Sequence, residues 1–302
     1  MDFLMRRFCI FLAILMTLFT VSCGSQSEKK SAVSDGKIHV FVSILPQKYF
    51  VEKIGGDYVT VEALVGPGQS PHTFEPSPQQ MTALSSADVF FRIGFPFEVS
   101  WLDKISQVNP KMKIVDTREG ITLLPMTSHH HESDQDHQDE GSMDPHIWLS
   151  PNLVKLQAHT IYDSLSKLDP QHNDYFYYNL QTFFNDLDSL RSEIRESFKN
   201  LKTSKFMVFH PSWGYFADEF GLEMIPIEIE GKEPNAKDLA EIIDLAKREN
   251  ISVIFVQTQF SQKSAESIAE KIGAKVVAID PLAENYMENM RHIAQVLSSE
   301  LK

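Results

Sequence analysis

The sequence predicts an α/β protein in which two lobes, each built around a parallel β-sheet, are joined by one long rigid helix. Short runs rich in β-branched and aromatic residues alternate with helical stretches from Ile38 onward, and the alternation falls into two separate series. One uninterrupted amphipathic segment lies between the two series. The length of 302 residues also suits two domains, because a domain has roughly 100–200 residues.

The candidate strands divide into a first group of four and a second group of four. The first group comprises 38–45, 59–64, 88–93 and 112–115, and the second comprises 205–209, 223–229, 252–256 and 275–279. Helical stretches such as 78–87 and 236–248 separate many of these strands, which indicates parallel pairing. Pro226 makes its strand the least secure, because proline cannot donate a hydrogen bond to a sheet.

A linking helix is predicted over 170–201, within a connecting segment of 169–201. Asp169 is a suitable N-cap, and Pro170 suits the first helical position. Apolar residues then recur at steps of three or four: Phe176, Leu180, Phe183, Leu187, Leu190, Ile194, Phe198 and Leu201. A bundle or coiled-coil helix has the same pattern, but the flanking α/β series favour a spine packed against both lobes. The predicted lobes are therefore 38–168 and 202–302.

Residues 1–22 have the features of a signal peptide. Two arginines precede an apolar run that is shorter than the roughly 20 residues of a membrane span. The sequence Thr20-Val21-Ser22-Cys23 resembles a bacterial lipobox, although Thr20 replaces the usual leucine. A plain secretory signal and an uncleaved anchor are the alternatives. We expect acylation at Cys23, a polar tether over 23–37, and an extracytoplasmic location in the periplasm or at the cell surface.

Composition limits the class of protein and the partners. A hydrophobic content of 42% is sufficient for folded cores, and a formal charge of −13 argues against nucleic acid as a partner. Both cysteines, Cys9 and Cys23, lie in the first 23 residues, so the body of the chain has no thiol for a disulfide or a metal cluster. An oxidising compartment and a monomeric state are expected.

Residues 127–144 form a segment that cannot contribute to a core. They contain six acidic residues and four histidines, which are His129, His130, His131 and His137. A mobile loop is expected because the segment has no apolar periodicity. Solvated low complexity would explain the composition, but imidazole and carboxylate both bind zinc, which favours auxiliary capture of the metal.

Three histidines and one aspartate are the candidate ligands of a tight metal site. His72 lies in a glycine- and proline-rich turn, His146 precedes a helix, and His210 and Asp280 directly follow predicted strands. Ligands of open α/β sheets bind beyond the carboxyl ends of the strands. Each residue alone would also serve as a turn or cap residue. Three imidazoles and one carboxylate suit tetrahedral Zn²⁺, but spacing alone does not show that they meet.

Five motifs carry a resemblance to a known family. They are Ser-Pro-His-Thr-Phe-Glu-Pro-Ser-Pro at 70–78, Asp-Pro-His-Ile-Trp-Leu at 144–149, Phe-His-Pro-Ser-Trp-Gly-Tyr-Phe at 209–216, Gly-Lys-Glu-Pro-Asn at 231–235 and Ala-Ile-Asp-Pro-Leu at 278–282. In this order, from Ile38 to the C-terminus, they resemble the solute-binding proteins of bacterial zinc ABC importers, the ZnuA type of the cluster A-I proteins. The resemblance implies two α/β lobes, one long helix and a metal in the cleft between the lobes.

The resemblance also implies the roles of the residues. His72 and His146 would come from the first lobe, and His210 and Asp280 from the second. Zinc members have histidine at the third position, where manganese members have glutamate, and this chain has His210. Three imidazoles favour Zn²⁺, whereas more carboxylate and water would favour Mn²⁺. The implied partners are a membrane permease and its ATPase, with the lipid at Cys23 holding the protein at the membrane.

Three alternatives remain at this point. The protein could bind Mn²⁺ or Fe²⁺ within the same family, or it could be a surface adhesin. It could also be a zinc hydrolase with Glu75 as the base, but the sequence contains no HExxH, GxSxG or Walker motif, and we expect no enzymatic activity. Trp148, Trp213 and Phe74 flank the ligands, either to exclude water or as core residues. Zinc binding is expected to weaken as the pH falls towards the histidine pKa of about 6.5.

Overall fold

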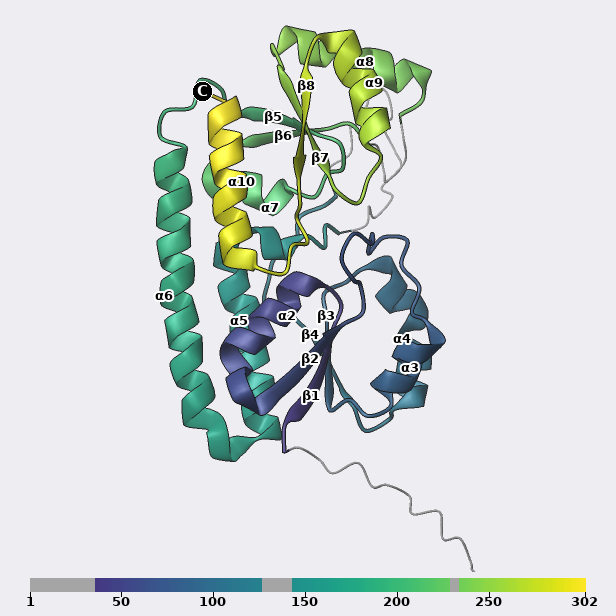
Figure 1. Cartoon of the computed structure of the whole chain (residues 1–302), viewed down its shortest axis with the longest axis vertical. Coiled ribbons are helices and arrows are strands. Elements are labelled where there is room, and N and C mark those ends of the chain that lie inside the picture. Colours follow the sequence, from purple (N-terminus) through teal and green to yellow (C-terminus); the bar gives the residue numbers. More distant parts are fainter. Residues whose placement is uncertain (1–35, 127–142, 229–233) are drawn as a thin grey trace, which may run out of the picture. The chain divides into compact units, whose positions relative to one another are not determined.

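The computed structural model describes residues 36–126, 143–228 and 234–302, and Figure 1 shows its elements. Eight parallel strands in these residues form two four-stranded sheets, ordered β2-β1-β3-β4 and β6-β5-β7-β8. The strands are β1 Ile38–Val42, β2 Val59–Ala63, β3 Val89–Arg92, β4 Lys113–Asp116, β5 Lys205–Val208, β6 Glu223–Pro226, β7 Val253–Gln257 and β8 Lys275–Ile279. The prediction of two α/β lobes with parallel sheets is confirmed.

Nine α-helices accompany the sheets within the described residues. They are α2 Leu45–Gly55, α3 Pro78–Leu84, α4 Pro96–Val108, α5 Pro151–Leu168, α6 Asn173–Ser197, α7 Gly214–Phe220, α8 Ala236–Arg248, α9 Gln262–Ile272 and α10 Tyr286–Glu300. Short 3₁₀ turns, η1 Gly56–Tyr58, η2 Ile147–Leu149 and η3 Pro170–His172, lie between some of them. None of the helices in the described part of the chain is both long enough and apolar enough to span a membrane.

Two strands, β1 and β6, end earlier than the sequence predicts. β1 stops at Val42, short of the predicted residue 45, because the Ser43 N–H donates to Gln47 Oε1 (3.1 Å) and Ile44 is the N-cap of α2. β6 stops at Pro226, short of the predicted residue 229. The proline is tolerated there because β6 is an edge strand.

The linking helix is shorter than predicted at both ends. Pro170 begins the 3₁₀ turn η3, so α6 starts at Asn173, and the helix ends at Ser197 rather than at residue 201. The Phe198 N–H is shared among three carbonyls of the last turn, which closes the helix. The 25 residues of α6 span about 38 Å at 1.5 Å per residue. The helix packs against α2 and α5 and against α10 near the C-terminus, as expected for a spine.

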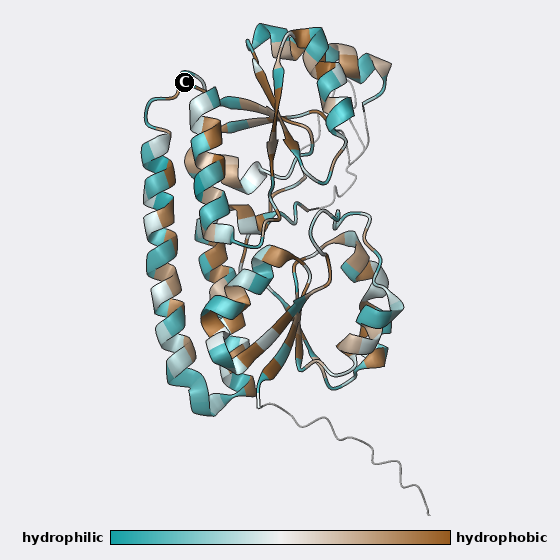
Figure 2. Ribbon diagram, in the orientation of Figure 1, coloured by the Kyte–Doolittle hydropathy of each residue, from teal (hydrophilic) through white to brown (hydrophobic). Residues whose placement is uncertain are grey.

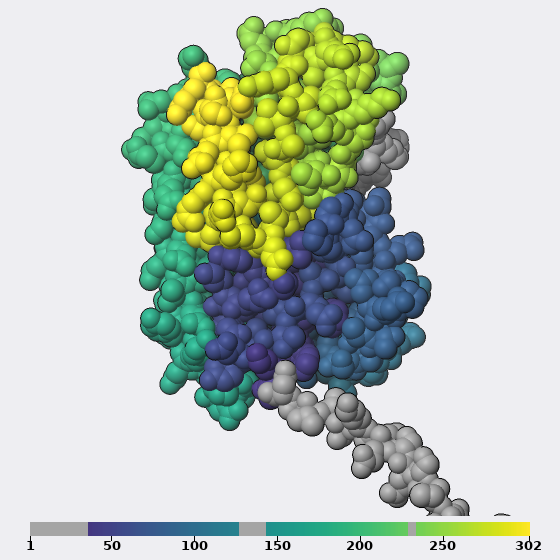
Figure 3. Space-filling view, in the orientation of Figure 1, coloured from purple at the N-terminus to yellow at the C-terminus, as the bar shows by residue number. Residues whose placement is uncertain are grey.

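The buried face of α6 belongs to a core that extends through both halves of the molecule. The predicted positions Phe176, Leu180, Phe183, Leu187, Leu190 and Ile194 are all buried. The same cluster includes strands of both sheets and residues of α5 and α10, while a smaller cluster lies beneath α8 and α9. In Figure 2 the strands are mostly brown and the outer helix faces mostly teal. Figure 3 shows the C-terminal residues lying directly on the N-terminal ones, where Lys48 pairs with Glu284.

The contribution of α6 packing is testable with two leucines of different burial. Leu187 on α6 is fully buried, whereas Leu156 on α5 is 43% exposed. Leu187→Ala should lower the free energy of unfolding by about 2–5 kcal/mol, because it opens a cavity in the shared core. Leu156→Ala should change it by less than about 0.5 kcal/mol. Urea denaturation measures both, and equal losses would contradict the proposed role of the α6 face.

Candidate metal centre

Three histidines that are far apart in the sequence meet in one buried pocket. His72 lies in the loop between β2 and α3, His146 directly before η2, and His210 two residues after β5. The Nε2 atom of His72 lies 3.3 Å from Nε2 of His146 and 3.1 Å from Nε2 of His210. The candidate ligand atoms of all three residues lie within 4.8 Å of one another.

These distances fit a hydrogen bond between neighbouring rings, and they are also close to those expected when the rings share one metal ion. Two nitrogen ligands of tetrahedral zinc, at Zn–N distances of about 2.0–2.1 Å, lie roughly 3.3–3.4 Å apart. The cavity between the rings has a volume of about 10 Å³, which is room for one water-sized species. Its walls include Ser70, Pro71, Trp148, Gln259, Phe260 and Pro281. The pocket is therefore suited to a single ion and is too small for an organic substrate.

Carboxylates fix the orientation of two of the three rings. Nδ1 of His146 lies 2.6 Å from Asp144 Oδ1, and Nδ1 of His210 lies 2.6 Å from Glu228 Oε2. When each Nδ1–H donates to its carboxylate, the Nε2 lone pair is directed into the pocket. The sequence analysis did not identify either carboxylate as functional. Asp144 stands two residues before His146, which is a usable signal, but nothing in the sequence connects Glu228 with His210.

Asp144 lies outside any mobile loop, which corrects the predicted bounds of 127–144. It is 1% exposed, its N–H donates to the Leu124 carbonyl (2.8 Å), and Pro125 and Met143 form an antiparallel bridge beside it. The histidines of the acidic segment, His129, His130, His131 and His137, lie outside the described residues, as does Cys23.

The fourth predicted ligand, Asp280, is placed next to the pocket but is not grouped with the histidines. Its Oδ1 accepts hydrogen bonds from Gln259 Nε2 and from the Leu282 N–H, both at 2.9 Å. Gln259, Pro281 and Leu282 all line the pocket. Among the described residues, the group of converging ligand atoms consists of the three imidazoles alone.

Burial lowers the pKa values of two histidines of the site and raises the pKa of the neighbouring aspartate. Desolvation, aided by the His146 and His210 imidazoles, lowers the pKa of His72 to about 2. Desolvation and the His210 imidazole hold the pKa of His146 well below its usual value. Desolvation also raises the pKa of Asp144 to about 7, against the opposing effect of the His146 N–H. His72 and His146 are therefore neutral at physiological pH, the state that binds a metal.

Aromatic rings close the pocket on two sides. Phe95 meets His72 edge-on at a centroid distance of 5.2 Å, and Phe260 stacks on His210 at 4.6 Å. Trp148 contacts His146 at 5.2 Å. The other aromatics predicted to flank the ligands have core contacts, Trp213 with Phe216 and Phe74 with Phe97. Glu75 is exposed and does not line the pocket, which removes the nearest candidate for a hydrolytic base.

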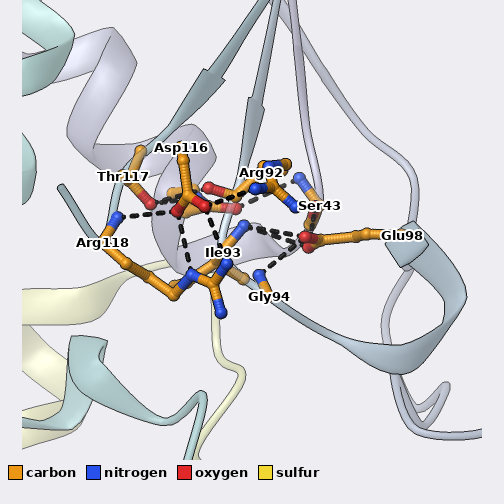
Figure 4. Close-up of polar contacts among 9 residues, drawn as sticks. Ser43, Arg92, Ile93, Gly94, Glu98, Asp116, Thr117 and Arg118 are labelled. Carbon is orange, nitrogen blue, oxygen red and sulfur yellow. Dashed lines mark hydrogen bonds and ion pairs between the residues drawn. The ribbon is translucent and has the colours of Figure 1, made fainter. Parts of the chain in front are cut away.

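The loop that carries Phe95 is held by a fully buried carboxylate. Glu98 on α4 accepts hydrogen bonds from the Ser43 hydroxyl (2.6 Å) and from the N–H groups of Ile93 (3.0 Å) and Gly94 (2.6 Å) (Figure 4). Beside it, Asp116 pairs with Arg92 and Arg118. This network at the carboxyl ends of β1, β3 and β4 fixes the loop whose Phe95 ring packs against His72.

Known proteins resemble this chain over most of its length. Residues 40–300 match the family described as zinc-uptake complex component A, periplasmic, or ZnuA. The zinc-binding lipoprotein AdcA of Streptococcus pneumoniae (strain ATCC BAA-255 / R6) is 30% identical over 317 residues, covering 98% of this chain. This chain spans only 62% of the length of AdcA. The high-affinity zinc uptake system protein ZnuA of Bacillus subtilis (strain 168) is 30% identical over 280 residues, covering 90% of this chain and 88% of that protein.

Solved structures show the same fold. The crystal structure of ZnuA matches with a TM-score of 0.82 and 45% identity, covering 88% of this chain and all of that one. A ZnuA deletion mutant with zinc bound matches with a TM-score of 0.81 and 45% identity, covering 88% of this chain and 98% of that one.

The wall beside His72 generates a prediction about stability. Glu98→Ala should lower the free energy of unfolding by about 2–4 kcal/mol, because the Ile93 and Gly94 N–H groups lose their buried acceptor. Glu75→Ala, at an exposed position of the neighbouring loop, is the control and should have an effect below about 0.5 kcal/mol. Thermal and urea unfolding measure both variants. Similar stabilities would mean that Glu98 does not hold this wall.

Proposed function

Because the chain belongs to the ZnuA family of zinc-uptake components, we propose that it is the extracytoplasmic zinc-binding subunit of an ABC importer. It captures Zn²⁺ in the pocket of His72, His146 and His210 and delivers the ion to a membrane permease whose ATPase drives transport. The observation that carries this proposal is the approach of Nε2 atoms from three separate loops to 3.1 and 3.3 Å. A cation shared by the three rings would bring basic nitrogens this close in a buried pocket and would stabilise them there.

The donor set supports zinc over manganese. The pocket offers three imidazoles, and Mn²⁺ prefers carboxylate and water ligands. We assign the fourth position to Asp280, which directly precedes the pocket residue Pro281 and is bonded to another lining residue, Gln259. Four protein ligands complete a tetrahedral zinc site and leave no position for a reacting water, which suits a carrier better than a hydrolase.

The remaining roles extend the proposal to segments beyond the described residues. Acylation at Cys23 would hold the protein at the outer surface of the membrane, although one lipid signal alone binds only marginally. His129, His130, His131 and His137 would raise the local zinc concentration through weak contacts. The protein would act as a monomer, with the permease as its docking partner.

Removal of one ligand tests the proposed function directly. His210→Ala should weaken Zn²⁺ binding by at least about 100-fold, because the site loses a ligand and the Glu228 carboxylate loses its partner. His159→Ala is the matched control, since its side chain is 59% exposed on α5. Isothermal titration measures the affinity, and elemental analysis of protein purified without added metal identifies the bound ion. Equal zinc affinity of wild type and His210→Ala would overturn the proposed site, and manganese in the purified protein would overturn the metal.

We expect the pH dependence of zinc binding to include a contribution from Asp144, whereas His72 and His146 contribute little near neutral pH. Ionised Asp144 accepts the Nδ1–H of His146 in a charge-assisted hydrogen bond and stabilises a cation bound by that ring, and its pKa is about 7. Below this pH each zinc ion must displace a proton from Asp144, so the affinity should fall by up to about tenfold per pH unit. His72, with a pKa of about 2, and His146 add no competing proton in this range.

Competition titrations between about pH 7.5 and about pH 5.5 measure this slope. Asp144→Asn should bind zinc more weakly at the upper pH and lose the slope that Asp144 contributes. A wild-type affinity that does not change over this interval would refute the assignment to Asp144.

A further inference from the structure

The segment that carries His146 is hydrogen-bonded to the second half of the molecule on both sides of the ligand. Before the ligand, the Tyr215 hydroxyl donates to the Asp144 carbonyl (2.8 Å) and accepts from the Leu124 N–H (2.9 Å). Just after it, Trp148 Nε1 donates to the Pro281 carbonyl (2.8 Å). His146 thus stands between two contacts to residues that follow β5 in the chain.

A third contact lies at the start of α5. The Glu219 carboxylate accepts from the Ser150 hydroxyl (2.5 Å) and from the Asn152 N–H (3.1 Å). Its other oxygen accepts from Arg191 Nε (2.5 Å) on α6, so Glu219 connects α5, α6 and α7. Its side chain is only 6% exposed, which makes this ion pair less screened than a surface pair.

Tyr215 and Glu219 act from one face of the same helix. They stand four residues apart on α7, and positions i and i+4 lie on the same side of a helix. The loop that carries His210 leads into α7. Helix α7 therefore follows the ligand His210 in the chain. Its side chains also hold both ends of the segment that carries the ligand His146.

The contact from Tyr215 continues to the imidazole itself. Asp144, whose carbonyl accepts from Tyr215, also accepts through Oδ1 from the His146 N–H (2.9 Å) and lies 2.6 Å from its Nδ1. A displacement of the Asp144 backbone would therefore turn the His146 ring. Gly214 leaves room for this arrangement, because a Cβ at that position would lie 2.9 Å from Asp144 Oδ2.

We propose that Tyr215 and Glu219 of α7 are positioning residues of the metal site, which keep His146 and His210 together as a preassembled pair. The inference rests on the proposed zinc-binding function. It differs from the division implied by the family resemblance, in which His146 belongs with His72 in the first lobe. The ring of His72 instead contacts Phe95 and the other two histidines.

The test uses Tyr215→Phe, which removes the hydroxyl and keeps the ring. The Leu124 N–H and Asp144 carbonyl lose this partner, so the affinity for Zn²⁺ should fall by about tenfold or more. The visible absorption of the Co²⁺-loaded protein should also change, because it reports the geometry around the metal. Tyr178→Phe, at a 70% exposed position of α6, is the control and should match wild type in both measurements.

Glu219→Gln is the second variant and should shift zinc affinity and the cobalt spectrum in the same direction. If circular dichroism shows that Tyr215→Phe does not fold, the zinc affinity and cobalt spectrum of Glu219→Gln test the role of α7 instead. Wild-type zinc affinity and an unchanged cobalt spectrum in the folded variants would overturn the role of α7. Failure of the proposed function would look different, because wild type and Tyr178→Phe would then also fail to bind zinc.

Discussion

The structure depends on one constraint, which is that three imidazole lone pairs must point at the same small volume. Without a cation between them, nitrogens 3.1 and 3.3 Å apart in a buried pocket repel one another unless a proton is shared. The protein opposes this repulsion by fixing the rings from behind. Asp144 and Glu228 hold two Nδ1 atoms, while Phe95 and Phe260 limit how far the rings can turn. Burial then keeps protons off His72 and His146.

Much of the fold followed from the sequence because local patterns determine it. The eight strands and the apolar face of α6 follow hydrophobic periodicity, which reflects burial directly. Errors occurred where side chains compete with backbone hydrogen bonds. The Gln47 side chain ends β1 by accepting the Ser43 N–H, and Pro170 starts a 3₁₀ turn instead of α6. Such endings depend on contacts that have no sequence period.

The candidate site was predictable only in part, for a related reason. His72, His146 and His210 stand out because the motifs around them are distinctive. Glu228 carries no such signal, and the motif at 209–216 contains Tyr215 without indicating its role. The partners of these two residues lie 18 and 71 residues away and are defined only by the folded chain. The same limit applies to Asp280, whose place beside the pocket is clear but whose oxygen is bonded to Gln259.

The two carboxylates behind the imidazoles also bear on how a doubly charged ion can be buried. A cation in a low-dielectric pocket is costly unless opposite charge lies close to it. The imidazoles supply lone pairs but no negative charge, and the pocket walls are mostly apolar. When ionised, Asp144 and Glu228 place two negative charges one imidazole away from the ion, in addition to the carboxylate of the proposed ligand Asp280. The burial that raises the pKa of Asp144 disfavours its charge only while the cation is absent. Metal binding and ionisation of this carboxylate should therefore favour each other, and the Tyr215–Asp144–His146 contacts link α7 to that coupling.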